Sequence, residues 1–320
     1  MSKITVVGAG AWGTALALQA VRAGHSVALV DRTADSAAAI QEKRENRRLP
    51  GVRLPDAIAV TDHLPDTSDL LVWVVPTQHL RSSLVKLSPK VGGIVVCAKG
   101  VEAGTDMLPL EVACDVTGAR PLAVLSGPNF AHEIAAGLPA ATVVASVDAD
   151  LREQGRAAFG TNTFRLYGNN DPIGAQLGGA AKNVIAIAAG AVIGAGLGEN
   201  ARAALVTRGL SELRRLAVAL GGRAETMMGL SGLGDLMLTC TGMSSRNFSL
   251  GYALGQGKSL DAILAGRTAV TEGVATAAAL VERAGDVELP ICQTVADFLS
   301  GKKTLDQSIT QLLSRPQRDE

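Results

Sequence analysis

One lysine stands inside a long run of small and apolar residues. Residues 178–190 read GGAAKNVIAIAAG, where Lys182 carries the only charge between Asp171 and Glu199 and is followed by Asn183. An unpartnered ammonium group is costly to bury, and lysine is seldom buried without a partner. A buried ammonium could donate a proton to an oxygen that gains negative charge during a reaction. The alternative is a lysine whose stem packs in the core while its head reaches water.

Further polar residues could complete a site around such a proton donor. Arg246 lies between Ser245 and Asn247 in TGMSSRNFSLG. A guanidinium binds phosphate through a planar fork, although a lone arginine is more often a solvated surface residue. Asp235 in GLGDL could orient the buried lysine or only cap a helix. Lys99 follows the apolar run GGIVVCA, and ligands gather at the carboxyl ends of strands in open α/β sheets.

A glycine-rich loop close to the N-terminus is typical of dinucleotide-binding sites. The first apolar run leads into GAGAWG, where Gly8, Gly10 and Gly13 have the G-x-G-x-x-G spacing. These glycines allow a tight turn, a close approach of the backbone to a pyrophosphate, and packing of the next helix on the sheet. Asp31 follows 18 residues after Gly13, at the end of the next predicted strand. A complete strand, loop and helix therefore favours a nucleotide site over a glycine turn without ligand.

The pattern of apolar residues differs between the two halves of the chain. The apolar runs KITVVG, SVALVD, LLVWVVP, GIVVCAKG, LAVLSG and ATVVAS are continuous, as in strands that are buried on both faces of a parallel sheet. After Asp171 such runs stop and long helical stretches follow. We therefore predict an α/β fold, with a doubly wound Rossmann-type parallel sheet in a dinucleotide-binding domain at 1–170 and an all-helical substrate domain at 171–320.

Composition narrows the class of protein. The 320 residues are 47% hydrophobic with a formal net charge of +0, so a sizeable core is expected and no overall basic field is available to bind nucleic acid. The apolar run 184–198 contains four glycines and falls short of the roughly 20 residues of a membrane-spanning helix. The four cysteines form no CxxC pair, and the four histidines match no metal-ligand spacing. We expect no metal site, no integral membrane segment and a reducing cytoplasm.

Several segments together resemble one enzyme family. They are GAGAWGTA at 8–15, AKG at 98–100, SGPNFAHE at 126–133, GGAAKN at 178–183, GLGDLMLTCT at 232–241 and SSRN at 244–247. This combination resembles the NAD(P)-dependent glycerol-3-phosphate dehydrogenases of the bacterial type, over nearly the whole chain. The resemblance implies hydride transfer that interconverts dihydroxyacetone phosphate and sn-glycerol 3-phosphate with NAD or NADP. It also implies supply of glycerol 3-phosphate for phospholipid synthesis, and a homodimer.

The resemblance also assigns roles to single residues. The family's proton donor and acceptor falls on Lys182, and a lysine that touches substrate and cofactor falls on Lys99. The other substrate contacts fall on Gly127, Asn129, Asp235, Ser245, Arg246 and Asn247. The family's cofactor contacts fall on Trp12, Arg32, Lys99, Ala131, Arg246, Val270 and Glu272. The three loop glycines with Ala11, and Asp31 at the end of the second predicted strand, complete the predicted cofactor site.

Three positions depart from the family's pattern. Ala11 stands where a serine is usual, Asn129 replaces a serine or threonine but can still donate a hydrogen bond, and Asp31 is unusual at its site. An acidic residue there normally accepts hydrogen bonds from the ribose of NAD and repels the 2′-phosphate of NADP, whereas the adjacent Arg32 could bind that phosphate. We therefore predict that both cofactors are used.

Two rival functions remain at this point. A related dehydrogenase of a β-hydroxyacid or of ketopantoate would bind a carboxylate in place of a phosphate. A catalytically silent dinucleotide sensor would bind the cofactor without turnover, although the presence of Lys182, Lys99 and Arg246 counts against it.

Overall fold

The computed structural model describes residues 1–87, 92–267 and 271–314. Its residues form two compact units. The first contains Met1–Lys99 and Pro109–Gln176, and the second contains Gly100–Leu108 and Leu177–Glu320. The short segment Gly100–Leu108 groups with the second unit although it lies early in the chain. The predicted division of function after residue 170 is not tested by this grouping.

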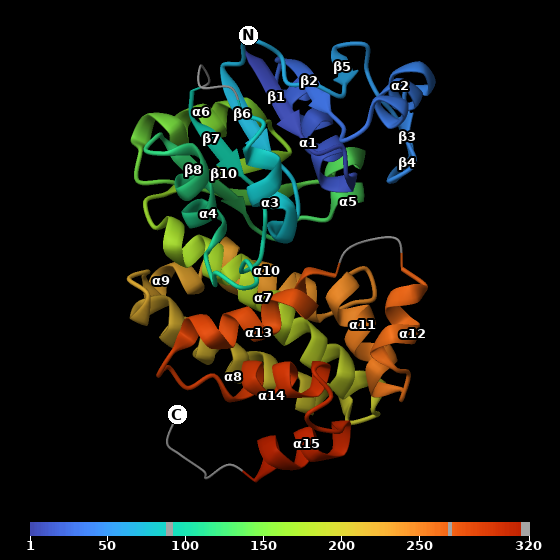
Figure 1. The fold of residues 1–320 in the computed structure, drawn as a ribbon, viewed down its shortest axis with the longest axis vertical. Helices are drawn as coiled ribbons and strands as arrows, with labels where there is room; N and C mark the ends of the chain where they lie inside the picture. The colour runs from blue at the N-terminus through green and yellow to red at the C-terminus, as the bar shows by residue number, and fades with distance from the viewer. Residues whose placement is uncertain (88–91, 268–270, 315–320) are drawn as a thin grey trace. The chain divides into compact units, whose positions relative to one another are not determined.

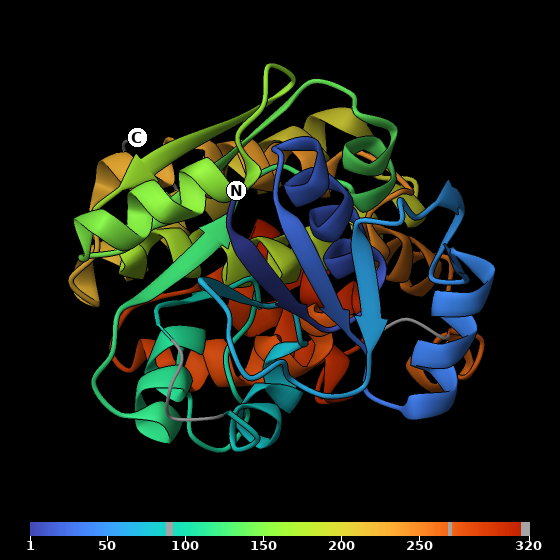
Figure 2. The same cartoon turned by 90° about the horizontal axis from the view of Figure 1, so that it is seen from above.

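An eight-stranded sheet forms the centre of the first unit, with strand order β10-β9-β8-β7-β6-β1-β2-β5. Its strands, in chain order, are β1 (Lys3–Val7), β2 (Ser26–Val30), β5 (Ile58–Thr61), β6 (Leu70–Trp73), β7 (Ile94–Val96), β8 (Leu122–Ser126), β9 (Ala140–Ala145) and β10 (Phe164–Asn169). The six predicted apolar runs all form strands of this sheet, which confirms the predicted sheet. Figure 2 shows β1, β2 and β5 side by side in successively lighter blue.

The sheet differs from the prediction at its two edges. The edge strands β5 and β10 were not predicted, and β10 alternates buried and exposed residues over much of its length, as expected for a strand with one covered face. The sheet is also not parallel throughout, because β9 runs antiparallel to β8 while β10 is parallel to β9. The stretch between β8 and β9 contains only the six-residue helix α5 (Ala131–Ala136).

Among the described residues, six helices of the first unit pack around this sheet. They are α1 (Ala11–Arg22), α2 (Ala34–Lys43), α3 (Thr77–Leu84), α4 (Pro109–Thr117), α5 and α6 (Ala149–Phe159). α1 packs with α5 and α6, whereas α3 packs with α4 (Figure 1). Strand order reverses at β1, with β2 on one side and β6 on the other. Right-handed crossovers then place helices on both faces, which makes the sheet doubly wound and leaves the glycine loop at the reversal point.

The second unit is helical, as predicted for the C-terminal part of the chain. It contains most of α7 (Pro172–Gly194), then α8 (Gly198–Ala219), α9 (Ala224–Met227), the π-helical turn η1 (Leu230–Gly234), α10 (Asp235–Cys240), α11 (Arg246–Gly255), α12 (Leu260–Ala265), α13 (Glu272–Ala284), α14 (Pro290–Leu299) and α15 (Leu305–Leu313). In the described part of the chain, α7 is the one helix long and apolar enough to cross a membrane. Because 78% of its most apolar window is buried inside the protein, α7 matches the central helix of a globular unit.

α7 and α11 cross in direct backbone contact. Gly190 and Gly194 on α7 approach the backbone of α11, and Gly251 and Gly255 on α11 approach the backbone of α7. A Cβ atom built on Gly251 would lie 1.9 Å from the carbonyl oxygen of Ile187, and one on each of the other three glycines would lie within 2.3 Å of a carbonyl oxygen of the facing helix. Only glycine allows this approach. The crossing therefore sets the N-terminus of α11, which carries the predicted phosphate-binding residues, against the helix that carries the buried lysine.

Candidate functional site

The three glycines of the N-terminal loop meet different constraints. Gly8 has φ +110°, and a Cβ there would lie 2.5 Å from the carbonyl oxygen of Val74. A Cβ on Gly13 would lie 1.9 Å from the carbonyl oxygen of Gly8, so both residues are required by the fold. Gly10 has an ordinary φ of −75°, and its Cβ would meet nothing within 4 Å. The fold leaves open space at Gly10, beside the N-terminus of α1, where a pyrophosphate would fit.

Trp12 belongs to the first turn of α1 and packs partly on the core of the first unit, as do the predicted cofactor residues Ala11 and Ala131. Cys97, which contacts Trp12, is buried. Burial raises the pKa of the Cys97 thiol to about 12, while the nearby Lys99 and a hydrogen bond with Trp12 lower it. A neutral, buried thiol fits the predicted role of a small packing residue and not that of a nucleophile.

Asp31 follows β2 and is turned into the protein. Its carboxylate accepts hydrogen bonds from the backbone N–H of Arg32, at 2.6 Å, and from the hydroxyl of Ser36. It also forms an ion pair with Arg48, at 3.3 Å between Nη1 and Oδ2. Only 3% of its side chain is exposed, whereas Arg32 is exposed. The sequence pattern had suggested a carboxylate open to the ribose, and it gave no indication of the arginine that pairs with it.

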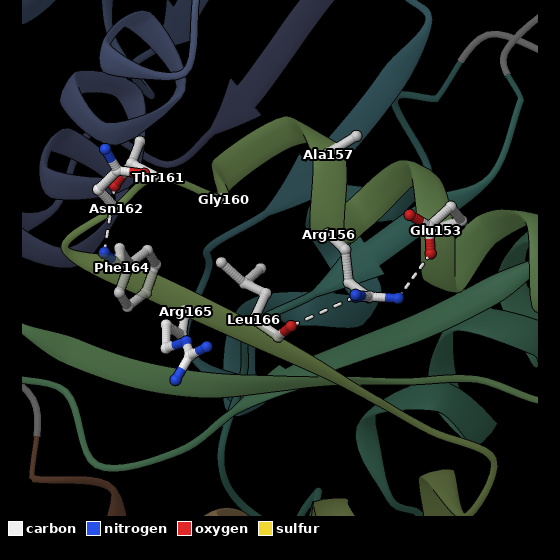
Figure 3. A pocket seen from close by; sticks show the side chains of 9 residues that line it. All are labelled: Glu153, Arg156, Ala157, Gly160, Thr161, Asn162, Phe164, Arg165 and Leu166. Atoms are coloured by element: carbon white, nitrogen blue, oxygen red, sulfur yellow. Dashed lines mark hydrogen bonds and ion pairs between the residues drawn. The ribbon is translucent and has the colours of Figure 1, made fainter.

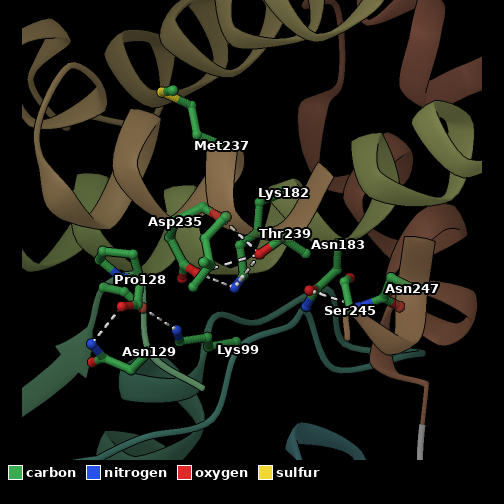
Figure 4. Close-up of polar contacts among 12 residues, drawn as sticks. Lys99, Pro128, Asn129, Lys182, Asn183, Asp235, Met237, Thr239, Ser245 and Asn247 are labelled. Atoms are coloured by element: carbon green, nitrogen blue, oxygen red, sulfur yellow. Dashed lines mark hydrogen bonds and ion pairs between the residues drawn. The ribbon is translucent and has the colours of Figure 1, made fainter. Parts of the chain in front are cut away.

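The loop after β8 holds Gly127 and Asn129, two of the predicted substrate residues of the first unit, and Lys99 after β7 contacts this loop. Lys99 donates a hydrogen bond to the carbonyl oxygen of Gly127, at 3.0 Å (Figure 4). The side-chain amide of Asn129 donates hydrogen bonds to the carbonyl oxygens of Pro128 and Ala141, at 2.6 and 3.1 Å. Its buried Oδ1 has no hydrogen-bond partner. In this arrangement both amide hydrogens of Asn129 are used within the chain and its oxygen is left as an acceptor, and a contact between Asn129 and a ligand stays a prediction.

Lys182 is buried together with a carboxylate. Its Nζ donates hydrogen bonds to Oδ1 of Asp235 and, at 3.0 Å, to the hydroxyl of Thr239 (Figure 4). Only 9% of the lysine side chain and 1% of the aspartate side chain are exposed. The ammonium is paired with a buried carboxylate, which argues against a lysine whose head extends into water. A paired, hydrogen-bonded charge is the form in which a lysine is tolerated at such a position.

The surroundings of Asp235 decide between its two predicted roles. The turn Leu230–Gly234 runs directly into α10, and Gly234 already has helical dihedral angles. Asp235 is therefore inside continuous helical backbone, and the alternative of a helix N-cap is wrong. Its side chain accepts a hydrogen bond from Lys182, as the other predicted role requires. Burial raises the pKa of the adjacent Cys240 to about 12; Lys182 lowers it and Asp235 raises it.

A chain of amide hydrogen bonds connects α7 to the start of α11 and α13. Asn247 donates to Oδ1 of Asn183, at 2.8 Å, and accepts from the backbone N–H of Gly273, at 3.1 Å (Figure 4). Asn183 and Asn247 are 5% and 8% exposed. Ser245 uses its hydroxyl to cap α11, accepting from the backbone N–H of Phe248 at 3.2 Å. These residues fix the geometry around the N-terminus of α11.

A second arginine stands beside Arg246. Arg246 is the first residue of α11 and is exposed. Arg267 donates to the carbonyl oxygen of Arg246, at 2.8 Å, and to the hydroxyl of Ser249, at 3.0 Å. Partial burial and the charge of Arg246 lower the pKa of Arg267. Two guanidinium groups near a helix N-terminus form a positively charged site that could bind a phosphate.

Two other predicted cofactor residues lie near this segment of the chain. Glu272 is the first residue of α13 and is partly buried. Val270 lies outside the described residues. Sequence reasoning missed both Arg267 and Thr239. Thr239 could have been found, because a residue four positions after Asp235 on a helix shares its face. Arg267 carries no such local signal.

A hollow of about 390 Å³ elsewhere in the first unit contains none of these residues. Residues between 153 and 166, from α6 to β10, line it (Figure 3). Its Arg156 is already engaged with Glu153, at 2.7 Å, and with the carbonyl oxygen of Leu166, at 3.3 Å. Among the described residues, no cluster of three His, Cys, Asp or Glu side chains could hold a metal ion.

Comparisons with known proteins agree over the whole chain. Family models described as the N-terminus and the C-terminus of NAD-dependent glycerol-3-phosphate dehydrogenase match residues 3–152 and 171–310. A protein of Acidiphilium cryptum named glycerol-3-phosphate dehydrogenase, NAD(P)+, is 55% identical over 99% of this chain and 98% of its own length. A protein of the same name from Rhodospirillum rubrum is 50% identical over 99% of this chain and 93% of its own length.

A solved structure shows the same fold. The crystal structure of glycerol-3-phosphate dehydrogenase from Coxiella burnetii superposes with a TM-score of 0.91 and 35% sequence identity. The superposition covers 98% of this chain and 99% of that one.

Proposed function

Because the chain belongs to the family of the NAD-dependent glycerol-3-phosphate dehydrogenases, we propose that it interconverts dihydroxyacetone phosphate and sn-glycerol 3-phosphate with NAD(P)H. The observation that carries the proposal is the buried Lys182, held by Asp235 and Thr239. The product supplies the glycerol backbone of phospholipids. In this proposal residues 1–170 form the dinucleotide-binding domain, which also contributes Lys99 and Asn129 to the substrate, and residues 171–320 form the substrate domain and carry the proton donor.

Lys182 acts on the oxygen of the ketone. The bound cofactor supplies the hydride that reduces the carbonyl carbon. The ammonium group of Lys182 stabilises the negative charge that develops on the carbonyl oxygen and then transfers a proton to it. Asp235 and Thr239 accept hydrogen bonds from the ammonium group and hold it in place. In the reverse direction, the neutral lysine accepts the proton from the alcohol.

The rest of the substrate is bound by groups that the structure orients. Arg246, with Arg267 behind it, binds the phosphate at the N-terminus of α11. The unpartnered Oδ1 of Asn129 accepts a hydrogen bond from a substrate hydroxyl, which also removes the cost of a buried acceptor without a donor. Lys99 binds substrate and cofactor at the end of β7.

The dinucleotide binds at the loop of Gly8, Gly10 and Gly13. The fit rests on the open space at Gly10 and on the backbone N–H groups of the first turn of α1. Trp12, Arg32, Ala131 and Glu272 are proposed as further cofactor contacts. Oxidation of NADH and NADPH, followed by absorbance with dihydroxyacetone phosphate and a panel of unphosphorylated keto acids, tests the proposal. Turnover of the keto acids alone would favour the rival dehydrogenase, and binding without any turnover would favour a sensor.

Arg246→Ala is expected to weaken binding of dihydroxyacetone phosphate far more than binding of unphosphorylated dihydroxyacetone. A lost hydrogen bond to a charged group is worth about 1.5–3 kcal/mol. The measurement is kcat/KM for both ketones. Arg214→Ala, which removes an exposed arginine from α8, is the matched control and should leave both values near those of the wild type. Equal losses for the two ketones in Arg246→Ala would show that Arg246 does not bind the phosphate.

A reducing compartment such as the cytoplasm and a homodimeric assembly complete the proposal. All four cysteines are free, and Cys97, Cys240 and Cys292 are buried. Such thiols need no oxidising environment. The homodimer rests on the family resemblance alone, and light scattering of the purified protein measures it directly.

A further inference from the structure

The ion pair between Arg48 and Asp31 lies at the end of β2, where a dinucleotide-binding sheet meets the adenosine ribose. Arg48 follows Asp31 by 17 residues and belongs to a separate small hairpin. That hairpin pairs β3 (Glu45–Asn46) with β4 (Leu49–Arg53), and Arg47 and Arg48 form the turn between them.

The hairpin is fixed to the glycine loop. Asn46 donates to the carbonyl oxygen of Ala9, at 3.0 Å, and to the hydroxyl of Thr14, at 2.8 Å. Arg48 donates to the same carbonyl oxygen of Ala9, at 3.0 Å. The guanidinium therefore bridges the loops that follow β1 and β2. It is 37% exposed, so it adds positive charge to a surface where Asp31, at 3% exposed, adds little.

This pairing changes what Asp31 can do. A carboxylate that accepts hydrogen bonds from a ribose must present its oxygens to the ligand, and its charge must repel a 2′-phosphate. Here the oxygens already accept from Arg32, Ser36 and Arg48. The charge is balanced by an arginine 3.3 Å away. An ion pair has no net charge to repel the 2′-phosphate, and the exposed Arg32 next to it remains attractive to that phosphate.

We propose that Arg48 is a cofactor-specificity residue, which neutralises Asp31 and thereby allows this chain to accept NADP as well as NAD. The proposal rests on the proposed function, because it concerns the dinucleotide of that reaction. Without Arg48, the negative charge of Asp31 is no longer balanced, and it repels the 2′-phosphate. NAD carries a hydroxyl at that position and is affected little.

The test measures binding of NADPH, NADH and 2′,5′-ADP to the protein without substrate, by titration calorimetry. Arg48→Ala is expected to weaken NADPH and 2′,5′-ADP about tenfold relative to NADH, which corresponds to about 1.4 kcal/mol. Arg47→Ala removes the same charge from the neighbouring turn position and should change this ratio less than about twofold. Arg48→Gln, which keeps a polar side chain, gives the same comparison if the alanine variant does not fold.

A double variant separates pairing from direct contact. Asp31→Asn combined with Arg48→Ala removes both charges, and the NADPH affinity should return to within about threefold of the wild type. The midpoint of thermal unfolding, which Arg48→Ala alone is expected to lower, should recover as well. No recovery of NADPH affinity would overturn the proposal, because Arg48 would then act on the phosphate itself. Equal weakening of NADH and NADPH by Arg48→Ala would also overturn it. Failure of the wild type to bind either nucleotide would instead count against the proposed function.

Discussion

Lys182→Ala is expected to lower kcat roughly 10²–10⁴-fold, the usual contribution of a positioned acid or base. The alkoxide that forms on the substrate would lose both the ammonium that stabilises it and the proton that neutralises it. Titration of NADH should give a dissociation constant near that of the wild type, because the glycine loop belongs to the other compact unit. Turnover within a fewfold of the wild type would show that Lys182 is only structural.

The alanine variant also leaves Asp235 buried without its ammonium partner. Breaking a buried ion pair costs about 3–5 kcal/mol, so a loss of activity could reflect unfolding. Lys182→Ala combined with Asp235→Asn removes the stranded carboxylate. We expect this double variant to melt closer to the wild type and to remain inactive. Lys258→Ala, at an exposed lysine of the same unit, is the control and should keep full activity. Recovery of activity in the double variant would contradict proton donation by Lys182.

The sequence predicted the central strands because residues buried on both faces of a sheet must be continuously apolar. The edge strands β5 and β10 escaped prediction, since they are short or partly exposed and their residues carry a weaker signal. The antiparallel direction of β9 was also missed. The direction of β9 depends on the path of the segment that connects β8 to β9, and the pattern of apolar residues within a strand carries no information about that path.

The site was predicted in part for a similar reason. Local motifs indicated Lys182, Arg246 and the glycine loop. They did not decide what Asp235 does, because its partner is 53 residues away along the chain. The pairing of Arg48 with Asp31 is likewise a tertiary contact, and no sequence motif predicts the hairpin that makes it. Residues whose role is set by their own segment could be predicted, and residues whose role is set by a partner from another segment could not.

The crossing of α7 and α11 predicts a large effect on stability. Gly251→Ala would place a Cβ 1.9 Å from the carbonyl oxygen of Ile187, whereas real Cβ atoms essentially never come within 3.0 Å of such an atom. Both sides of the contact are helix backbone, so no side chain can rotate away. Overpacking a core typically costs about 1–3 kcal/mol, and we expect this substitution at or above the upper end of that range. The measurement is the free energy of unfolding in urea.

The same substitution should disturb the site before it unfolds the protein. If the helices separate to admit the methyl group, the hydrogen bond from Asn247 to Asn183, now 2.8 Å, must lengthen or break. The N-terminus of α11 would then move relative to Lys182, and KM for dihydroxyacetone phosphate should rise in the fraction that remains folded. Gly242→Ala is the matched control, because a Cβ there meets nothing within 4 Å, and it should change the free energy of unfolding by less than about 1 kcal/mol. If Gly251→Ala is as stable as Gly242→Ala, the close backbone contact between α7 and α11 does not exist in solution.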